Sequence, residues 1–234
     1  DKKYFYFVYK MASLSNRIVC NSSSTKQIFH SYYNKDQKHV KVIPCTHYDN
    51  LYPLKKSKKK LEIIGYLGAL TNRKRVLKLA DLAIEIKKSK LNLKIEIWGR
   101  GYLDKEIIKI SKKENLHKII KLKGMAPYEK INKIYNSFDF FVFPTEEEGL
   151  GLPIIEAMMC GLPVFVFGDA KIPEEIKSKC IVCKDEKDIV KRINILKKNR
   201  KKYNLTSKKM LKYSKNFNFE SNLNKLIQVY RELR

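Results

Sequence analysis

Two glutamates flank a glycine loop in the middle of the chain, which reads Glu148-Gly-Leu-Gly-Leu-Pro-Ile-Ile-Glu156. Gly149 and Gly151 predict a tight loop, and Pro153 suits the first position of a helix, where its missing N–H is not needed. The start of such a helix carries free N–H groups and a partial positive charge. The segment therefore predicts an anion site of the kind that holds phosphate.

The two carboxylates indicate what such a site could bind besides phosphate. Glu148 ends the strand side of the loop, and Glu156 is expected in the first turn of the helix. A carboxylate beside a phosphate is unfavourable unless it accepts hydrogen bonds from hydroxyl groups, which sugars and ribose offer. Plainer interpretations stay open here: Glu156 would complement the helix dipole, worth ~0.3–1 kcal/mol, and residues 146–148 would form a solvated acidic turn.

The elements that must position this loop alternate between strand and helix. Strands are predicted at 17–20, 40–44, 61–67, 93–98, 119–122, 138–143, 164–167 and 179–182. Helices are predicted at 21–33, 76–88, 103–113, 129–136, 153–160 and 185–196, with mostly helical structure from 207 and a lysine-rich linker at 46–60. This alternation predicts an α/β fold, a parallel sheet with helices on both faces. Three strands run into a glycine, at 68, 99 and 124, and such sheets bind ligands at the carboxyl ends of their strands.

The composition limits the classes of partner. The chain has 234 residues, with Lys+Arg 50 against Asp+Glu 24, so the net charge is +26. The hydrophobic content of 44% excludes global disorder, and no apolar run approaches the ~18 residues of a membrane span. The lysines fit a solvated basic surface or an attraction to an anionic membrane surface. We expect no nucleic acid as partner, because no stripe of arginine and aromatic residues is visible.

The cysteines and the missing motifs exclude further chemistries. Five cysteines with irregular spacing indicate no disulfide framework, and the pair Cys180 and Cys183 lacks the second pair that zinc requires. The sequence motifs of dehydrogenases, P-loop proteins, zinc proteases and serine hydrolases are absent. We expect no metal, no cofactor, and a cytoplasmic location, peripheral on the inner membrane face. The chain opens on Asp1 without an initiator methionine, so we expect it to be part of a longer product.

The loop and its two glutamates resemble the E-x7-E signature of retaining glycosyltransferases of the GT-B fold, in group 1 (family 4). Other parts of the chain also resemble that family: the segments 66–74, 97–101, 122–124 and 217–230, and the linker from Pro44 to Asp49. The resemblance covers almost the whole chain. It implies the tail of an acceptor-side domain and a linker at 1–52, a Rossmann-like nucleotide-sugar-binding domain at 53–203, and a C-terminal helix at 204–234 that packs back toward the first domain.

The resemblance implies a role for each matching position. Glu156 would hold the ribose hydroxyls of a nucleoside-diphosphate sugar, and Glu148 a hydroxyl of the donor sugar. Lys74 and the N–H groups of Gly151 and Leu152 would bind the diphosphate and stabilise the charge of the leaving nucleotide without a metal. The candidate catalytic residues are therefore Glu148 and Lys74. The other candidate donor-binding residues are Gly68, Arg73, Gly99, Met125, Ala126, Gly149 and Leu150, of which Met125 and Ala126 would line the base.

The activity implied by the resemblance is transfer of a hexose from a UDP- or GDP-linked sugar to a hydroxyl acceptor with retention, in glycolipid or surface polysaccharide synthesis. The partners would be that nucleotide sugar and a lipid-linked or polysaccharide acceptor. The sequence names neither sugar, base, acceptor nor oligomeric state. Two alternatives stay open: a donor-nucleotide-binding module that is inactive without a separate acceptor-side domain, and a basic nucleic-acid-binding protein.

Three places depart from the family pattern. Ala69 stands where the family often has arginine as a second phosphate-binding cation, and Arg73 or Arg75 could take that place. Pro44 is followed by cysteine and threonine, where the family usually has asparagine and glycine. Residues 170–172 replace the usual glycine pair before Pro-Glu, in a loop that touches the donor sugar in the family, so the identity of the sugar stays open.

Overall fold

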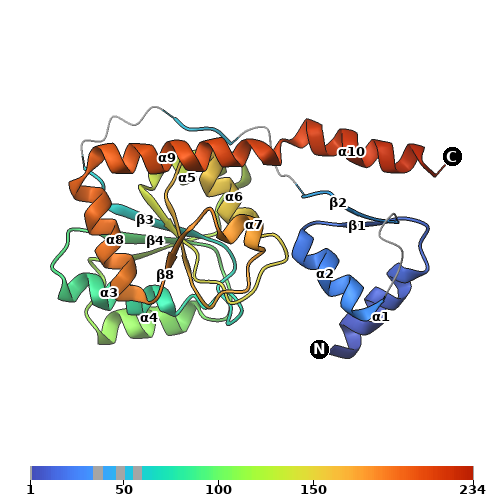
Figure 1. Cartoon of the computed structure of the whole chain (residues 1–234). Helices are drawn as coiled ribbons and strands as arrows, with labels where there is room; N and C mark the ends of the chain where they lie inside the picture. Colours follow the sequence, from blue (N-terminus) through green and yellow to red (C-terminus); the bar gives the residue numbers. More distant parts are fainter. Residues whose placement is uncertain (1, 34–38, 46–50, 55–59, 234) are drawn as a thin grey trace.

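The computed structural model describes residues 2–33, 39–45, 51–54 and 60–233. It consists of a large sheet domain and a small N-terminal unit beside it (Figure 1). The sheet domain is built on six parallel strands in the order β5-β4-β3-β6-β7-β8. These strands are β3 (Ile63–Leu67), β4 (Lys94–Trp98), β5 (Ile120–Gly124), β6 (Phe140–Val142), β7 (Val164–Phe167) and β8 (Ile181–Cys183).

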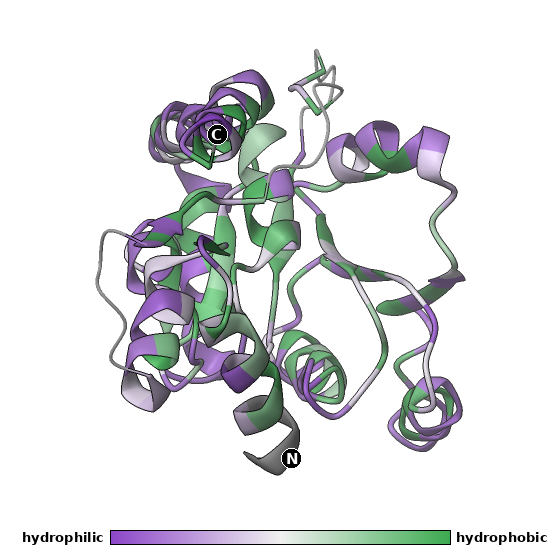
Figure 2. Ribbon diagram, turned by 90° about the vertical axis from the view of Figure 1, so that its right-hand side faces the viewer, coloured by the Kyte–Doolittle hydropathy of each residue, from purple (hydrophilic) through white to green (hydrophobic). Residues whose placement is uncertain are grey.

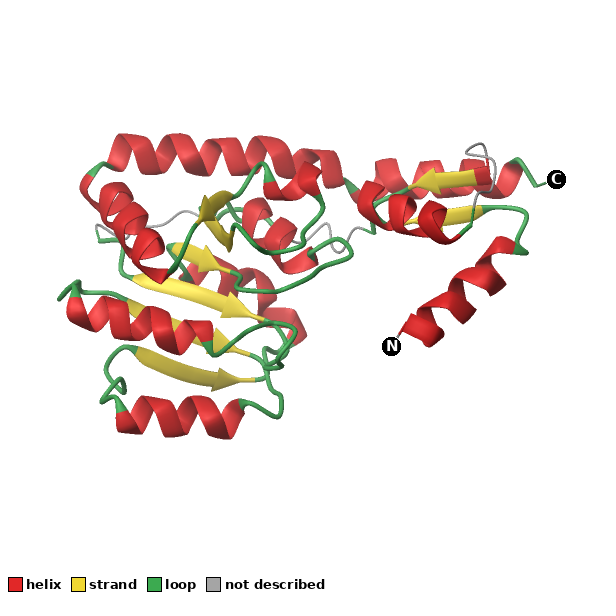
Figure 3. Ribbon diagram, turned by 60° about the horizontal axis from the view of Figure 1, so that its bottom comes forward, coloured by secondary structure: helices red, strands yellow, loops and turns green. Residues whose placement is uncertain are grey.

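Helices cover both faces of this sheet (Figure 3). They are α3 (Lys78–Lys88), α4 (Asp104–Lys113), α5 (Ile131–Ser137), α6 (Leu152–Met159), α7 (Glu174–Lys177), α8 (Glu186–Lys198) and α9 (Arg200–Ser214). A short 3₁₀ turn, η2 (Tyr128–Lys130), precedes α5. The predicted α/β fold class, a parallel sheet flanked by helices, is therefore confirmed.

The central strands form the core of the sheet domain. β6 and β7 are buried along their whole length and read Phe-Phe-Val and Val-Phe-Val-Phe. Strands covered on both faces need apolar side chains at every position, so these runs do not alternate with polar residues. Figure 2 shows the same contrast, with hydrophobic strands inside and hydrophilic outer helices.

The N-terminal unit contains α1 (Lys2–Ser13), β1 (Ile18–Cys20), α2 (Ser23–Tyr32) and β2 (Val40–Val42). β1 and β2 form a two-stranded parallel sheet. Its buried cluster is small: Ile18, Cys20, Phe29 and Val40. As the cap-rich segment 21–25 predicted, α2 begins after Ser22, whose Oγ accepts the N–H of Thr25 at 3.0 Å.

The C-terminal helices connect the two parts. α9 packs on α6 and α8, and a 3₁₀ turn, η3 (Lys215–Phe217), leads into α10 (Phe219–Arg231). α10 extends from the sheet domain over the N-terminal unit (Figure 1), and beyond it Glu232 lies 3.7 Å from Arg17. The expected boundary between residues 203 and 204 falls inside α9. Within the described residues, no helix has both the length and the apolar character to cross a membrane.

Several elements differ from the predicted ones. α1 and α7 were not predicted, because the aromatic run 4–9 does not distinguish helix from strand and α7 has only 4 residues. α9 begins at Arg200 and not near residue 207, because the Asn199 side chain caps it by accepting the N–H of Lys202 at 2.9 Å. The segment 129–136 divides into η2 and α5, and only Phe140–Val142 of the segment 138–143 forms a strand. Most of the linker, including Asp49, lies outside the described residues.

Candidate active site

Three strand ends are joined by backbone hydrogen bonds at the carboxyl edge of the sheet. The N–H of Gly68 donates to the carbonyl of Trp98 at 3.0 Å, and the N–H of Gly99 donates to the carbonyl of Gly124 at 2.8 Å. A Cβ atom on Gly99 would lie 1.9 Å from the carbonyl oxygen of Gly68. The two predicted glycines therefore lie against each other, and this approach has no room for a side chain.

Met125 and Ala126 follow the edge strand of this sheet. Met125 is 65% exposed directly after β5, and Ala126 packs partly against the core. Glu148 comes after β6, three strands away in the sheet order. At ~4.8 Å per strand this separation is about 14 Å. The structure thus places the two residues at the same edge as Glu148 but at a distance from it.

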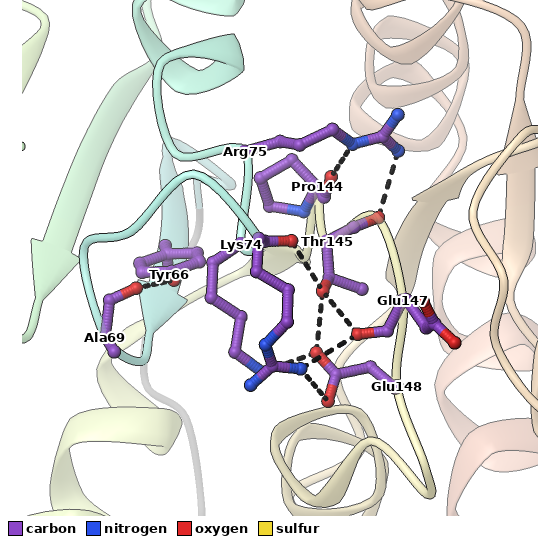
Figure 4. Close-up of polar contacts among 9 residues, drawn as sticks. Tyr66, Ala69, Lys74, Arg75, Pro144, Thr145, Glu147 and Glu148 are labelled. Atoms are coloured by element: carbon purple, nitrogen blue, oxygen red, sulfur yellow. Dashed lines mark hydrogen bonds and ion pairs between the residues drawn. The ribbon is translucent and has the colours of Figure 1, made fainter. Parts of the chain in front are cut away.

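Glu148 lies at the centre of a buried polar cluster (Figure 4). Its Oε1 accepts a hydrogen bond from Lys74 Nζ and another from Thr145 Oγ1 at 2.6 Å. The side chains of Lys74 and Glu148 are only 11% and 8% exposed. Lys74 follows β3 and Glu148 follows β6, and these strands are neighbours in the sheet, so residues 74 positions apart meet.

Burial and charge act in opposite directions on Lys74. Desolvation lowers the pKa of Lys74, and the hydrogen bond and charge of Glu148 counter that shift. The Lys74 ammonium also lies 5.0 Å from the centre of the Phe143 ring. Nearby, the Tyr66 hydroxyl donates to the carbonyl of Ala69 at 2.8 Å, and burial together with the Glu148 charge raises the pKa of Tyr66. The site therefore holds a paired cation and anion in an apolar frame.

The guanidinium of Arg75 binds the backbone of the segment that follows β6. Its Nε donates to the carbonyl of Pro144 at 2.8 Å and its Nη2 to the carbonyl of Thr145 at 2.9 Å. Its Nη1 pairs with Asp169 at 2.7 Å, and this hydrogen bond lowers the pKa of Asp169. Because the guanidinium already holds the segment after β6, it has little freedom to contact a ligand.

Arg73 has a different environment. Its side chain is 60% exposed, and its Nη1 lies 3.8 Å from Glu148 Oε2. The same nitrogen donates to the carbonyl of Glu147 at 3.0 Å. Of the two arginines that could replace the family's usual cation at position 69, the structure leaves Arg73 the more accessible.

The acidic loop, residues 146–148, is hydrogen-bonded to the segment that follows β7. The N–H of Glu148 donates to the carbonyl of Lys171 at 2.9 Å, and the N–H of Lys171 donates to the carbonyl of Glu146 at 2.7 Å. These two bonds form an isolated parallel bridge. The loop that lacks the family's glycine pair is thus the one that holds the backbone of Glu148.

The glycine loop ends in a left-handed residue that starts α6. Gly151 has φ +84° and precedes the helix, so Leu152 is its first residue and Pro153 its second. The expectation of proline at the first position is wrong by one residue, although a proline N–H is still not needed there. Glu156 is then the fifth residue of α6 and lies in its second turn, not in its first.

Glu156 has a neutral partner. Its Oε2 accepts a hydrogen bond from the Tyr135 hydroxyl at 2.6 Å, and Tyr135 itself is fully buried in α5. Burial raises the pKa of Glu156, whereas the hydrogen bond from Tyr135 lowers it. Burial and the nearby carboxylate raise the pKa of Tyr135 well above its usual value. The two predicted glutamates therefore have different partners: Glu148 accepts from an ammonium and a hydroxyl group, and Glu156 accepts from a hydroxyl group.

Sequence reasoning missed Thr145 and Tyr135, the hydroxyl partners of the two glutamates. Thr145 is fully buried only three residues before Glu148, and a polar residue at the end of an apolar strand is a signal that could have been used. Tyr135 gives no such signal, because its contact with Glu156 depends on how α5 and α6 pack. Cys180 and Cys183 are free, and burial raises the pKa of each thiol to about 12, so the pair matches a structural role.

This edge of the sheet combines groups that suit a phosphorylated sugar. Lys74 and Arg73 supply positive charge. At the start of α6, the N–H of Leu152 precedes the first helical hydrogen bond, in which Ile154 N–H donates to the Gly151 carbonyl at 2.9 Å. Glu148 and Glu156 supply acceptors for hydroxyl groups. In the described part of the chain, no group of three or more His, Cys, Asp or Glu side chains is placed to hold a metal ion.

Comparisons with known proteins give the family. The model of "Glycosyl transferases group 1" matches residues 53–212. The O-antigen chain mannosyltransferase B of Escherichia coli is 32% identical over 90 residues, which are 38% of this chain and 23% of that protein. The chain therefore spans about a quarter of the length of this curated relative.

Two solved structures share the fold. The crystal structure of TarM matches 97% of this chain and 46% of its own, with a TM-score of 0.83 and 21% identity. The pneumococcal O-GlcNAc transferase GtfA, solved in complex with UDP and GlcNAc, matches 98% of this chain and 47% of its own, with a TM-score of 0.78 and 20% identity. Because the family model covers more than half of the chain, this protein belongs to the group 1 glycosyl transferases.

Proposed function

We propose that this chain is the donor-binding part of a retaining, family 4 glycosyltransferase that moves a hexose from a UDP- or GDP-linked sugar to a hydroxyl group. The observation that carries the proposal is the buried cluster of Lys74, Thr145 and Glu148 beside the start of α6. The acceptor would be lipid-linked or a surface polysaccharide. The similarity to an O-antigen mannosyltransferase and to a transferase complexed with UDP supports this class of reaction.

The cationic residues and N–H groups of the site would act on the diphosphate of the donor. In the transfer, the bond between the sugar's anomeric carbon and the diphosphate oxygen breaks, and the acceptor oxygen bonds to that carbon. The acceptor's proton passes to the departing phosphate, on the same face of the sugar. Negative charge grows on the diphosphate, where Lys74, Arg73 and the N–H groups of Gly151 and Leu152 would stabilise it in place of a metal ion. We assign no protein nucleophile.

The carboxylates would bind hydroxyl groups. Glu156, whose Oε2 is held by Tyr135, would accept the ribose hydroxyls with its other oxygen. Glu148 would accept a hydroxyl of the sugar when the diphosphate draws Lys74 away from it. The base would lie over Met125 and Ala126 after β5. The backbone of Gly68 and Gly99 would line the donor between the base and the diphosphate. The loop from Gly149 to Leu152 would complete the donor site.

The test is a thermal-shift panel of UDP, GDP, ADP and CMP on the chain. A nucleotide at about 100 times its dissociation constant stabilises by ~2.7 kcal/mol, which is roughly 5–10 °C for a chain of this size. We expect a shift with UDP or GDP that is lost in the double variant Lys74→Met/Glu148→Gln. The double variant avoids leaving one buried charge without its partner.

The matched control is Glu146→Gln, which neutralises an exposed side chain two residues from Glu148 and should keep the shift. No shift with any nucleotide from folded protein would contradict the donor site. A shift that survives in the double variant would remove Lys74 and Glu148 from it. Proton NMR of the anomeric configuration of the product tests retention, and an unchanged nucleotide shift in EDTA tests independence of a metal.

One observation favours the second candidate, a donor-binding module that is inactive without a separate acceptor-side domain. The N-terminal unit has a two-stranded sheet, and several of its apolar side chains are more than half exposed: Tyr6, Phe7, Met11 and Leu14. Two-stranded sheets are marginal by themselves and parallel sheets are normally covered on both faces. Nucleotide binding without transfer to any acceptor would support the module over the complete enzyme.

A further inference from the structure

A lysine-rimmed apolar groove lies away from the donor site. It has a volume of about 720 Å³ and is formed where residues 51–53 pass the turn between α9 and α10. We call it the hinge groove; its apolar lining includes Leu51, Tyr52, Met159, Leu211, Phe217 and Phe219. Met159 is the last residue of α6, whose first residue belongs to the donor loop. Eight helical residues are ~12 Å long, so the two sites lie at opposite ends of α6.

Three lysines stand on one rim of the groove. Lys208, Lys212 and Lys215 line it from α9 and η3, and all three are exposed. Their spacing of four and three residues places them on one face of the helix. Among the described residues, none of the three forms an ion pair. Among the described residues that line the groove there is no acid, although Glu220 follows the last of them.

An exposed apolar stripe continues from the groove along α10. Phe219, Leu223, Ile227 and Tyr230 are 41%, 41%, 38% and 64% exposed. Their spacing of four, four and three residues forms one row on the helix. A contiguous exposed apolar strip beside a row of cations is the pattern of a surface that lies on anionic lipid.

We propose that this surface docks on an anionic lipid bilayer, with a lipid chain in the hinge groove and Lys208, Lys212 and Lys215 on phosphate headgroups. The apolar lining of the groove suits the hydrocarbon chain of a lipid. The lysines, which form no ion pair among the described residues, suit the negative charge of its headgroup. This inference goes beyond the proposed function, because it uses none of the donor-binding residues. It assigns the attraction of the +26 charge to a defined face of the molecule.

Vesicle co-sedimentation tests the proposal. The chain is mixed with phosphatidylcholine vesicles or with vesicles that also contain phosphatidylglycerol, at about 0.1 M salt, where charges interact over ~10 Å. We expect preferential binding to the anionic vesicles. Each lysine at such a surface contributes about a fivefold gain, so Lys208→Gln/Lys212→Gln/Lys215→Gln should weaken binding about 100-fold.

A control of identical charge and spacing exists on α4. Lys105, Lys109 and Lys112 are exposed, also four and three residues apart, and α4 lies on the opposite side of the sheet domain from α9 (Figure 1). Replacing these three with glutamine should weaken binding about threefold at most, because they lie beyond the screening distance. Restoring the charge with Lys208→Arg/Lys212→Arg/Lys215→Arg should keep binding.

The apolar part is tested separately. Phe219→Ser should weaken vesicle binding about tenfold, whereas Ile108→Ser on α4, with a similar exposure of 43% against 41%, should not change it. Equal losses in the two lysine triples would overturn the proposal in favour of an attraction by the total charge. Absence of preferential binding, or binding retained in the α9 triple, would also overturn it. Nucleotide shifts in the same variants should stay unchanged, which separates this result from any failure of the donor site.

Discussion

The sheet domain and the N-terminal unit use the same strand–helix pattern but bury very different amounts of apolar surface. The sheet domain joins six strands around one continuous core, whereas the N-terminal unit has two strands and a cluster of four buried apolar residues. α1 adds exposed aromatic side chains to that small unit. The comparison shows that the pattern specifies the local form of a parallel sheet, whereas a large buried core also needs enough strands with both faces covered.

The proposed donor site lies on one side of this difference. Lys74, Glu148 and Glu156 all come from the sheet domain, where neighbouring strands fix them. Among the described residues, the N-terminal unit contacts the glycine loop where Thr25 Oγ1 lies 3.5 Å from the carbonyl of Gly149. We therefore expect substitutions in the N-terminal unit to change its local stability without changing ligand binding, which depends on the sheet domain.

The largest expected effect distinguishes the two cores. Phe165 and Phe29 are equally buried, at 0% and 1% exposure, in the sheet domain and in the N-terminal unit. Phe165→Ala should lower the free energy of global unfolding by ~3–5 kcal/mol, because it leaves a cavity in the main core. Phe29→Ala should open only the N-terminal unit.

Urea unfolding and hydrogen exchange check this difference. In Phe29→Ala the amides of β1 and β2 should exchange faster, while the global midpoint and nucleotide binding stay constant. A fall of the global midpoint in both variants would show that the two parts unfold together and would remove the distinction.

The second prediction compares two glycines within the sheet domain. A Cβ atom on Gly99 would lie 1.9 Å from the Gly68 carbonyl, whereas on Gly124 it would meet nothing within 4 Å, although φ is +74°. Gly99→Ala should cost ~3 kcal/mol or more, since backbone must move, and Gly124→Ala only about 1 kcal/mol. Thermal midpoints measure both, and equal costs would mean that the strand ends can separate easily.

Much of this architecture could be predicted, and the reasons are local. The apolar runs at 138–143 and 164–167 predicted strands, and Ser22 and Asp185 lie at the predicted starts of their helices, where each side chain accepts a backbone N–H. These features depend on residues next to each other in the chain. The family resemblance then supplied residue roles that local physics left open, and these roles remain predictions.

The remainder depends on packing between distant segments. The bond between Tyr135 and Glu156 joins two helices, and the pairing of Arg75 with Asp169 joins residues 94 positions apart. Periodicity contains no information on either contact. The choice between Arg73 and Arg75 likewise needed the structure, because both are arginines in one loop and differ only in what surrounds them.

The third prediction concerns the buried carboxylate of Glu156. Because burial raises its pKa, the folded state holds this proton more tightly than the unfolded chain, and stability falls as pH rises through the range between the two values. Glu156→Gln keeps an acceptor for Tyr135 without the charge, so it should be more stable than the natural chain at about pH 7 and nearly equal at about pH 4.

The same variant should bind the nucleotide about 10–100-fold more weakly, because a charged acceptor of ribose hydroxyls is lost. Urea unfolding at the two pH values and calorimetric titration with the nucleotide measure both effects. A variant that is less stable at neutral pH would show that the ionised carboxylate supports the fold, and unchanged affinity would remove Glu156 from the donor site.

The smallest expected effect lies at the contact between the two parts. The N–H of Ser23 donates to Glu175 Oε1 at 3.1 Å, in a partly exposed position. Glu175→Ala should destabilise the docking of α2 by only ~0.5–1 kcal/mol. Faster hydrogen exchange confined to α2 and β1 would agree with this value. A loss of several kcal/mol in global stability would mean that the contact is a major support of the fold.

The ion pair between Lys74 and Glu148 has a consequence for selectivity among anions. An anion that binds Lys74 must compete with a carboxylate already in place, so chloride or free phosphate has to break a contact that it cannot replace. A ligand that brings both a phosphate and a hydroxyl group can replace both halves of the pair at once. The proposed donor site thus contains its own competing anion, the carboxylate of Glu148, which should favour ligands with both groups over simple salts.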